Sequence, residues 1–279
     1  MLKNILVCLE GSPSSEAATR VSLEIAKACG ARLVGLAIID EPDIRAGVAT
    51  GIGGSSFKHE RDEALMADAR KHADDWVSMF ERRCRQADVP AAGLEIVGRP
   101  AQSILREMNA HDLTVIGRDA NFRFETETED LQTRDTILHQ AERPVLLVPE
   151  SKDPKLGQVV LVAYDGSGAA KRALASFAAS GLAEGREIHV ATVDDNGGQA
   201  WEMANRAVQM LATSGISARA HNIVSVLSNV DALFAQANKL GAGMMVMGAF
   251  AHSRLRHLFS GSATRGLLET SDIPLYLQH

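Results

Sequence analysis

The 279-residue sequence lacks the features that mark several large classes of protein. No apolar run approaches the roughly 18 uninterrupted residues that a membrane span requires. The chain also does not open with the charged and apolar regions of a signal peptide, so we expect a cytoplasmic protein without a membrane segment. The 29 Lys and Arg residues are outnumbered by 35 Asp and Glu, and the formal net charge of -6 argues against a nucleic-acid platform.

Patterns that hold metals or perform catalysis are also missing. The three cysteines are scattered, with no C-x-x-C pair and no zinc-type spacing, and we interpret Cys8, Cys29 and Cys84 as reduced packing residues. The nine histidines form no tight cluster. No Ser/His/Asp order, Walker A lysine or paired acid and base stands out. We therefore predict no catalytic residues and no metal ligands.

The chain contains an internal repeat. Apolar residues make up 46% of the sequence, which indicates a globular chain. Its 279 residues are enough for two domains of ordinary size. A buried-strand run at residues 4–9 leads into Gly11-Ser12, and a similar run at 158–163 leads into Gly166-Ser167, 155 positions later. A helix and a second strand follow in each half, so the chain is predicted to be a tandem repeat of βαβ units with parallel sheets.

The rest of each half matches as well. In the first half we expect a helix at 14–30 with Ser14 or Ser15 as N-cap and Gly30 as its end, followed by a strand at 31–39. The later elements of the two halves correspond in order: helices 63–86 and 199–213, strands 94–97 and 218–224, helices 101–109 and 226–240, strands 113–117 and 244–248, and last strands 143–148 and 273–277. The first half carries about 24 extra residues, most of them expected at 40–60, where a Gly- and Ser-rich run favours a surface loop over a phosphate site.

The predicted fold class is α/β, with two tandem doubly wound, five-stranded, Rossmann-like parallel-sheet domains of strand order 3-2-1-4-5. We place the domains at 1–150 and 158–279, joined by a polar linker at 151–157. In such sheets a ligand lies at the carboxyl ends of the strands, where the strand order reverses. Asp165, Val193 and Gly248 follow or end three strands of the second half and are expected to line one crevice.

These residue types suit a nucleotide. The Asp165 carboxylate suits a pair of ribose hydroxyls, and the backbone near Val193 could contact the edge of an adenine. The loop from Gly248 to Ser262 would bind the phosphates. Gly261-Ser262 stands directly before a predicted helix, where free N–H groups and the helix dipole favour an anion. The alternatives are that Asp165 only caps a turn and that the glycines serve turns only. The loop also holds Arg254, Arg256 and His257, which would screen phosphate charge or form a solvated basic face.

On these residues the sequence resembles a tandem universal stress protein over both halves. The resemblance rests on the strand ending Val162-Ala-Tyr-Asp165-Gly-Ser167, the last strand with Pro274, and the loop motif G-x2-G-x9-G-[S/T], in which Ala251 replaces the second glycine. It implies a cytoplasmic stress-response protein of a family in which some members bind ATP. By position, Asp165 and Gly248 would contact ribose, Val193 the adenine, and Ala251, Gly261, Ser262 and Ala263 the phosphates, with Ala251 weakening the binding.

The resemblance also implies pairing through last strands, here 145–148 against 275–277 within one chain, which would cover two edge strands. The first half departs from the family pattern. Glu10 stands in place of Asp165, Leu131-Gln132 in place of Gly-Ser, and carboxylates crowd residues 125–130. We expect like charge to exclude ATP there, and we leave open whether this acidic loop collects a cation or is simply solvated.

The leading functional hypothesis is a stress regulator that binds ATP or a related adenine nucleotide in its second half, with the accompanying metal, magnesium or manganese, left open. One alternative is a slow ATPase, for which Asp165 and His252 are the nearest general-base candidates. Another is a nucleotide-free interaction protein that engages a partner through residues 40–60. A homodimer and further protein partners are left open.

Overall fold

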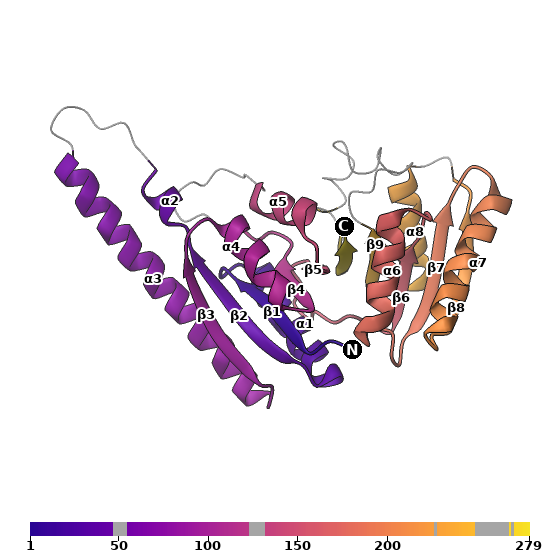
Figure 1. Ribbon diagram of the computed structural model, residues 1–279, viewed down its shortest axis with the longest axis horizontal. Helices are drawn as coiled ribbons and strands as arrows, with labels where there is room; N and C mark the ends of the chain where they lie inside the picture. Colours follow the sequence, from indigo (N-terminus) through magenta and orange to yellow (C-terminus); the bar gives the residue numbers. More distant parts are fainter. Residues whose placement is uncertain (47–54, 123–131, 226–227, 249–267, 269–270) are drawn as a thin grey trace.

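Within the described residues, ten strands form one sheet that runs through both halves of the chain (Figure 1). The computed structural model describes residues 1–46, 55–122, 132–225, 228–248, 268 and 271–279. The strand order is β3-β2-β1-β4-β5-β10-β9-β6-β7-β8, so each half has the order 3-2-1-4-5. The predicted fold class is therefore confirmed, including the reversal of strand order beside the first strand of each half.

The first half provides five strands and five α-helices among the described residues. Its elements are β1 (Asn4–Leu9), α1 (Pro13–Cys29), β2 (Arg32–Ile39), α2 (Glu41–Ile44), α3 (Ser55–Gln86), β3 (Ala91–Val97), α4 (Pro100–Glu107), a 3-10 turn (Met108–Ala110), β4 (Leu113–Gly117), α5 (Gln132–Gln140) and β5 (Val145–Val148). The second half has β6 (Val159–Ala163), α6 (Gly168–Ser180), β7 (Glu187–Val193), α7 (Gly197–Thr213), β8 (Ala218–Ile223), α8 (Asn229–Leu240), β9 (Met244–Gly248) and β10 (Leu275–Gln278).

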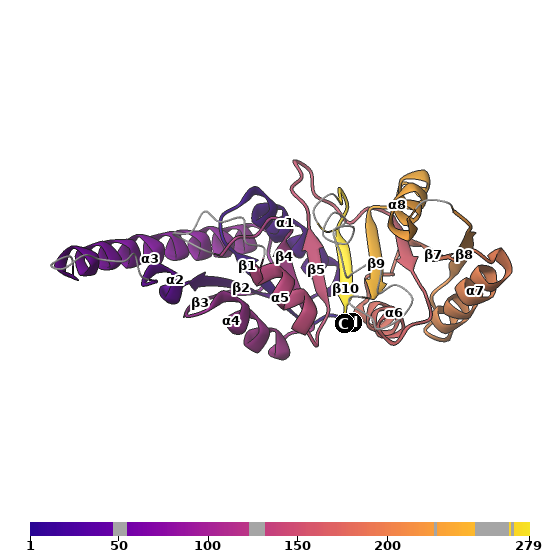
Figure 2. The same cartoon turned by 90° about the horizontal axis from the view of Figure 1, so that it is seen from above.

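Helices cover both faces of the sheet, because alternate residues of its buried strands enter two separate cores. Ile5 and Val7 of β1 pack with α1 and α3, whereas Leu6 and Cys8 pack with α4 and α5. The second half repeats this arrangement, and Tyr164 just after β6 faces the layer of α6 and α7. Figure 2 shows the two helical layers on either side of the strands.

The two halves are joined by their last strands, as the resemblance implies. β5 and β10 pair antiparallel, with Leu146 opposite Tyr276, while every other neighbouring pair in the sheet is parallel. Tyr276 is fully buried, and its hydroxyl donates to Ser176 Oγ at 3.1 Å. Its ring meets Phe177 edge-on at 6.0 Å. The polar linker also packs into the structure, because Leu156 is fully buried.

Three local expectations are wrong. The N-cap of α1 is Ser12, not Ser14 or Ser15, because Pro13 takes the first helical position and Ser12 Oγ accepts from Ser15 N at 3.1 Å. The helix expected from residue 63 begins at Ser55, and β3 begins at Ala91 instead of residue 94. α3 therefore has 32 residues against 17 for its counterpart α7, and it extends past the sheet (Figure 1).

The segment at 40–60 is correspondingly less of a loop than expected. Its start forms α2, capped by the Asp40 carboxylate, which accepts from Asp43 N at 3.1 Å. Its end belongs to α3, where Lys58 Nζ and Arg61 donate to the main-chain carbonyls of Arg45 and Ile44. The glycine run between them, at 51–54, lies outside the described residues.

Candidate functional site

Asp165, Val193 and Gly248 lie at the carboxyl ends of three neighbouring strands. Val193 ends β7, Gly248 ends β9, and Asp165 follows β6, which pairs with both. This is the point where the strand order reverses, the usual place for a ligand in an open parallel sheet. The structure thus brings these three predicted site residues to one edge.

The Asp165 carboxylate is positioned by the turn between β6 and α6. Asp165 Oδ1 accepts from Ser167 N at 3.0 Å, and Ser167 in turn caps α6 by accepting from Ala170 N at 3.1 Å. Gly166 makes the turn with a φ of 74°, a conformation that glycine adopts without strain. Asp165 therefore does cap a turn, and its side chain is half-buried at the crevice.

Val193 offers its main chain toward the same crevice. Asp194 N donates to Ile223 O at 3.2 Å on the β8 side. Because successive residues of a strand point their main-chain groups in opposite directions, the N–H and C=O of Val193 face β6 and Asp165. Thr192 Oγ1 donates to Tyr164 O at 2.7 Å and ties the two strand ends together.

Gly248 allows a close contact between β9 and α6. A Cβ atom at Gly248 would lie 2.6 Å from the carbonyl carbon of Ala169 and 2.9 Å from Ala169 Cβ. Real Cβ atoms do not approach so closely, so the glycine has a packing role beside any contact with a ligand. The same is true of Gly117 in the first half, where a Cβ would meet Ser14 Oγ at 2.6 Å.

The other predicted site residues lie outside the described residues. These are the phosphate-loop positions Ala251, Gly261, Ser262 and Ala263, together with His252, Arg254, Arg256 and His257. In the first half, Leu131 and the acidic residues at 125–130 also lie outside them.

Glu10 takes the place of Asp165 in the first half and has a different environment. Burial raises the pKa of its carboxyl to about 7, although hydrogen bonds from Ser12 and the main chain of Asn121 oppose the shift. Ser12 Oγ donates to the Glu10 carboxylate, and Glu10 N donates to Ser15 Oγ at 3.3 Å. Much of the Glu10 population is thus uncharged near neutral pH.

The long helix α3 walls the first-half crevice. Glu10 borders a cavity of about 260 Å³ that is also lined by Ile38, the counterpart of Val193, and by α3 side chains including His72 and Trp76. The rings of His72 and Trp76 lie 6.0 Å apart. Ala91 pairs with Leu33 in the first half, and Ala218 pairs with Ile188 in the second. Leu33 and Ile188 are equivalent at the offset of 155, so Ala91 and Ala218 are equivalent too. The third strands and the helices before them are therefore offset by 127 positions. By that offset Gln199 and Met203 of α7 take the places of His72 and Trp76, so the second half lacks these two rings.

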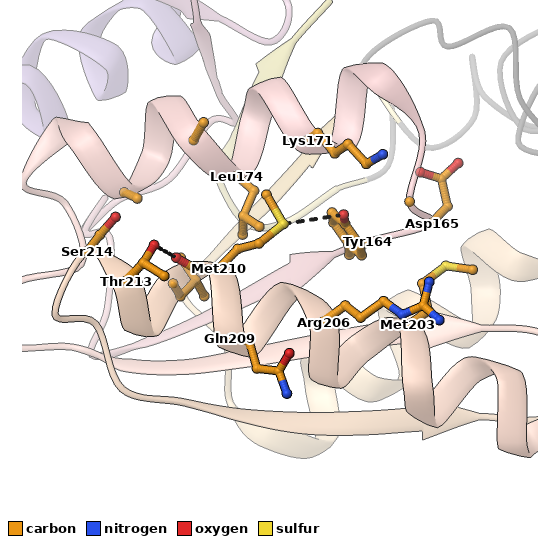
Figure 3. Close-up of a pocket in the computed structure, with 14 residues that line it drawn as sticks. Tyr164, Asp165, Lys171, Leu174, Met203, Arg206, Gln209, Met210, Thr213 and Ser214 are labelled. Atoms are coloured by element: carbon orange, nitrogen blue, oxygen red, sulfur yellow. Dashed lines mark hydrogen bonds between the residues drawn. The ribbon is translucent and has the colours of Figure 1, made fainter.

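Sequence reasoning missed both the wall and a second cavity. A cavity of about 750 Å³ lies between α6 and α7 and reaches Asp165 and Gly166 at one end (Figure 3). Its lining includes Lys171 and Arg206, which were not predicted. The offset of 127 would have aligned Trp76 with Met203 and so indicated the difference, but it becomes visible only once the β3 and β8 registers are known.

The described residues contain neither a metal-binding cluster nor a helix suited to a membrane. Within the ranges that the structure describes, no three His, Cys, Asp or Glu side chains are grouped closely enough to hold a metal ion. In the same ranges, no helix has the length and apolar character needed to cross a membrane.

Known proteins match this chain both in sequence and in structure. The sequence model of the universal stress protein family matches twice, at residues 1–149 and 158–278. A universal stress protein of Synechocystis sp. is 22% identical over 287 residues, which cover 98% of this chain and 99% of that protein. A universal stress protein structure from Archaeoglobus fulgidus superposes with a TM-score of 0.71 at 19% identity, covering 99% of this chain and 95% of the other.

A shorter match comes from Arabidopsis thaliana. That universal stress protein family protein was solved with AMP bound. It is 15% identical, covers 54% of this chain and 94% of its own, and has a TM-score of 0.38.

Proposed function

The chain belongs to the universal stress protein family with two repeats, and on that basis we propose that the second repeat binds ATP or a related adenine nucleotide. In this proposal the protein is a stress-response regulator with domains at 1–150 and 158–279. The second domain holds the nucleotide, and the first has a degenerate phosphate loop and does not.

The observation that supports the proposal is the meeting of Asp165, Val193 and Gly248 at the strand-order reversal. Asp165 stands half-buried at the crevice, where its carboxylate would meet the ribose hydroxyls, and the main chain of Val193 faces the same crevice for the adenine edge. Gly248 starts the loop that would carry the phosphates on Ala251, Gly261, Ser262 and Ala263. If magnesium accompanies the nucleotide, we expect the phosphates to supply most of its ligands.

The first domain differs in the features that the proposal uses. Glu10 is hydrogen-bonded to Ser12 and largely buried in place of a crevice carboxylate. The cavity beside it, at about 260 Å³, is below the range of roughly 300–1,000 Å³ typical of ligand pockets. A nucleotide would have to displace Trp76 and His72 of α3.

The test is to denature freshly purified protein, identify any nucleotide released, and titrate the stripped protein with ATP, ADP and AMP by calorimetry. We expect about one nucleotide per chain, the occupancy of a single site. Asp165→Asn keeps the turn-capping oxygen but removes the charge, and should weaken binding about tenfold, as expected for one charge-assisted hydrogen bond. Gly261→Asp should abolish binding, because it places a carboxylate at the phosphates.

Glu10→Gln is the matched control, because it changes the same position in the first domain and should leave nucleotide affinity unaltered. Absence of released nucleotide together with absence of heat would overturn the proposal in favour of a nucleotide-free interaction protein. ATP turnover measured on the same samples separates a slow ATPase from a binding protein.

A further inference from the structure

The cavity between α6 and α7 has an apolar body and a charged end. Tyr164 forms part of its floor, Leu174 and Ala178 line it from α6, and Met203 and Met210 line it from α7. Figure 3 shows Lys171, Asp165 and Arg206 gathered around the same end, beside Tyr164. Its volume of about 750 Å³ lies within the range of ordinary ligand sites.

The first repeat closes the equivalent space with larger side chains. A Cβ at Gly11 would lie 2.5 Å from Trp76 Nε1, and a Cβ at Gly166 would meet Met203 Sδ at 3.4 Å, so Trp76 and Met203 occupy matching positions. Phe80, one turn further along α3, matches Ala207 of α7. The cavity beside Trp76 and Phe80 is only about 80 Å³.

The remainder of the first-repeat groove is lined by several charged side chains. It forms a separate hollow of about 510 Å³ whose walls include Arg20 and Arg83. The matching residues in the second repeat are Ala175 and Met210, which line the larger cavity. The groove is therefore open and continuous in one repeat only, although the backbone scaffold is shared.

Two cations, Lys171 and Arg206, and one carboxylate, Asp165, line the charged end. Lys171 matches Glu16 and Arg206 matches Met79, so both cations are particular to the second repeat. Arg206 lies 3.7 Å from Glu202, but both side chains are largely exposed, at 75% and 72%, and such a pair contributes little stability. An incoming anion can therefore exchange with Glu202 at small cost.

We propose that this groove binds a medium-chain fatty carboxylate, with its head between Lys171 and Arg206 and its chain along α6 and α7. The planar guanidinium suits a carboxylate, and methionines adapt to flexible apolar chains. Lys171 and Ala178 are seven residues apart, a span of about 10 Å along a helix, which matches a medium-chain acyl group. The site lies below the nucleotide crevice, on the face of the sheet covered by α6 and α7, and borders it only at Asp165.

The test uses octanoate, titrated by calorimetry into nucleotide-free full-length protein. We expect one octanoate per chain, and octanol, which lacks the charged head, should bind about tenfold or more weakly, as expected for loss of a charge-assisted hydrogen bond. The double substitution Lys171→Gln and Arg206→Met should weaken octanoate binding by a similar factor. Met203→Trp, which copies the first repeat, should abolish it.

Lys239→Met is the control, because Lys239 is an exposed cation on α8, on the opposite face of the sheet. It should leave octanoate affinity unchanged. Circular dichroism and urea unfolding check that Met203→Trp is folded. The proposal is overturned if octanoate gives no heat at millimolar concentration, if octanol binds equally well, or if folded Met203→Trp still binds. Because the titration omits nucleotide, its outcome does not depend on ATP binding.

Discussion

Glu10 and Asp165 stand at the same position of the two repeats, and their surroundings separate them chemically. Both side chains are half-buried, but Glu10 borders a small cavity that is also lined by α3 and by residues after β4. Desolvation penalises the charged form of a carboxyl, which is why the pKa of Glu10 rises to about 7. Sequence alone shows the exchange of Asp for Glu, but it cannot show the burial, because the enclosing residues lie more than 50 positions away.

This burial predicts a pH-dependent stability. With a folded pKa near 7 against an ordinary 4.5, the folded protein holds the Glu10 proton more tightly than the unfolded chain. The stabilisation is fully present below pH 4.5 and is lost as the pH rises through 7. Relative to wild type, Glu10→Gln should gain up to about 3 kcal/mol in unfolding free energy between pH 4.5 and 8.

Urea unfolding of both proteins across that pH range measures the difference. Parallel stability curves for wild type and variant would show that Glu10 ionises in the folded protein as freely as in the unfolded chain. Glu150→Gln, at an exposed carboxylate two residues after β5, provides the control and should leave the pH dependence of wild type unchanged.

At the scale of single elements, the junction between β9 and α6 depends on Gly248. Gly248→Ala should destabilise the protein by roughly 1–3 kcal/mol, because the added methyl group overlaps Ala169 and forces α6 away from the sheet. Gly168→Ala, at the first position of the same helix, is the control. There the Cβ meets only the flexible end of Arg172, so stability should be equal or slightly higher. Equal thermal stability of the two variants would contradict the packing role of Gly248.

Continuous apolar runs were sufficient to predict most strands. Residues 4–9 and 113–117 were predicted with the observed bounds, because strands buried on both faces have apolar residues at nearly every position. The start of α3 was missed for the opposite reason. Residues 55–62 are mostly polar and exposed, and the contacts that Lys58 and Arg61 make with the end of α2 have no local sequence signal.

For the whole molecule, the joint between β5 and β10 predicts that the two repeats unfold together. Each repeat has one tryptophan, Trp76 on α3 and Trp201 on α7. The variants Trp76→Phe and Trp201→Phe therefore report on one repeat each. In each variant, tryptophan fluorescence should show the same urea midpoint as far-UV circular dichroism, because removing β10 would expose the edges of both half-sheets.

Two separate midpoints within either variant would show that each repeat is stable alone. The comparison is made inside one protein, so a change in overall stability caused by the substitution does not affect it.

The pairing of the last strands was predictable, whereas the groove between α6 and α7 was not. The pairing follows from the family resemblance and from two short apolar strands beside Pro144 and Pro274. The groove arises from the relative positions of α6 and α7, and from the absence on α7 of side chains as large as those on α3. Met203 and Ala207 are ordinary helix residues in sequence, and only superposition on Trp76 and Phe80 shows the space that they leave.

The antiparallel joint also has a consequence for how the protein responds to dilution. β5 and β10 belong to one chain, and the two repeats that carry them are linked through residues 149–158. Their encounter is therefore intramolecular, and its effective concentration is set by the linker. The ten-stranded sheet therefore persists at copy numbers at which a sheet assembled from two separate chains would dissociate. The stoichiometry of one open crevice to one walled crevice is likewise fixed at synthesis and is independent of expression level.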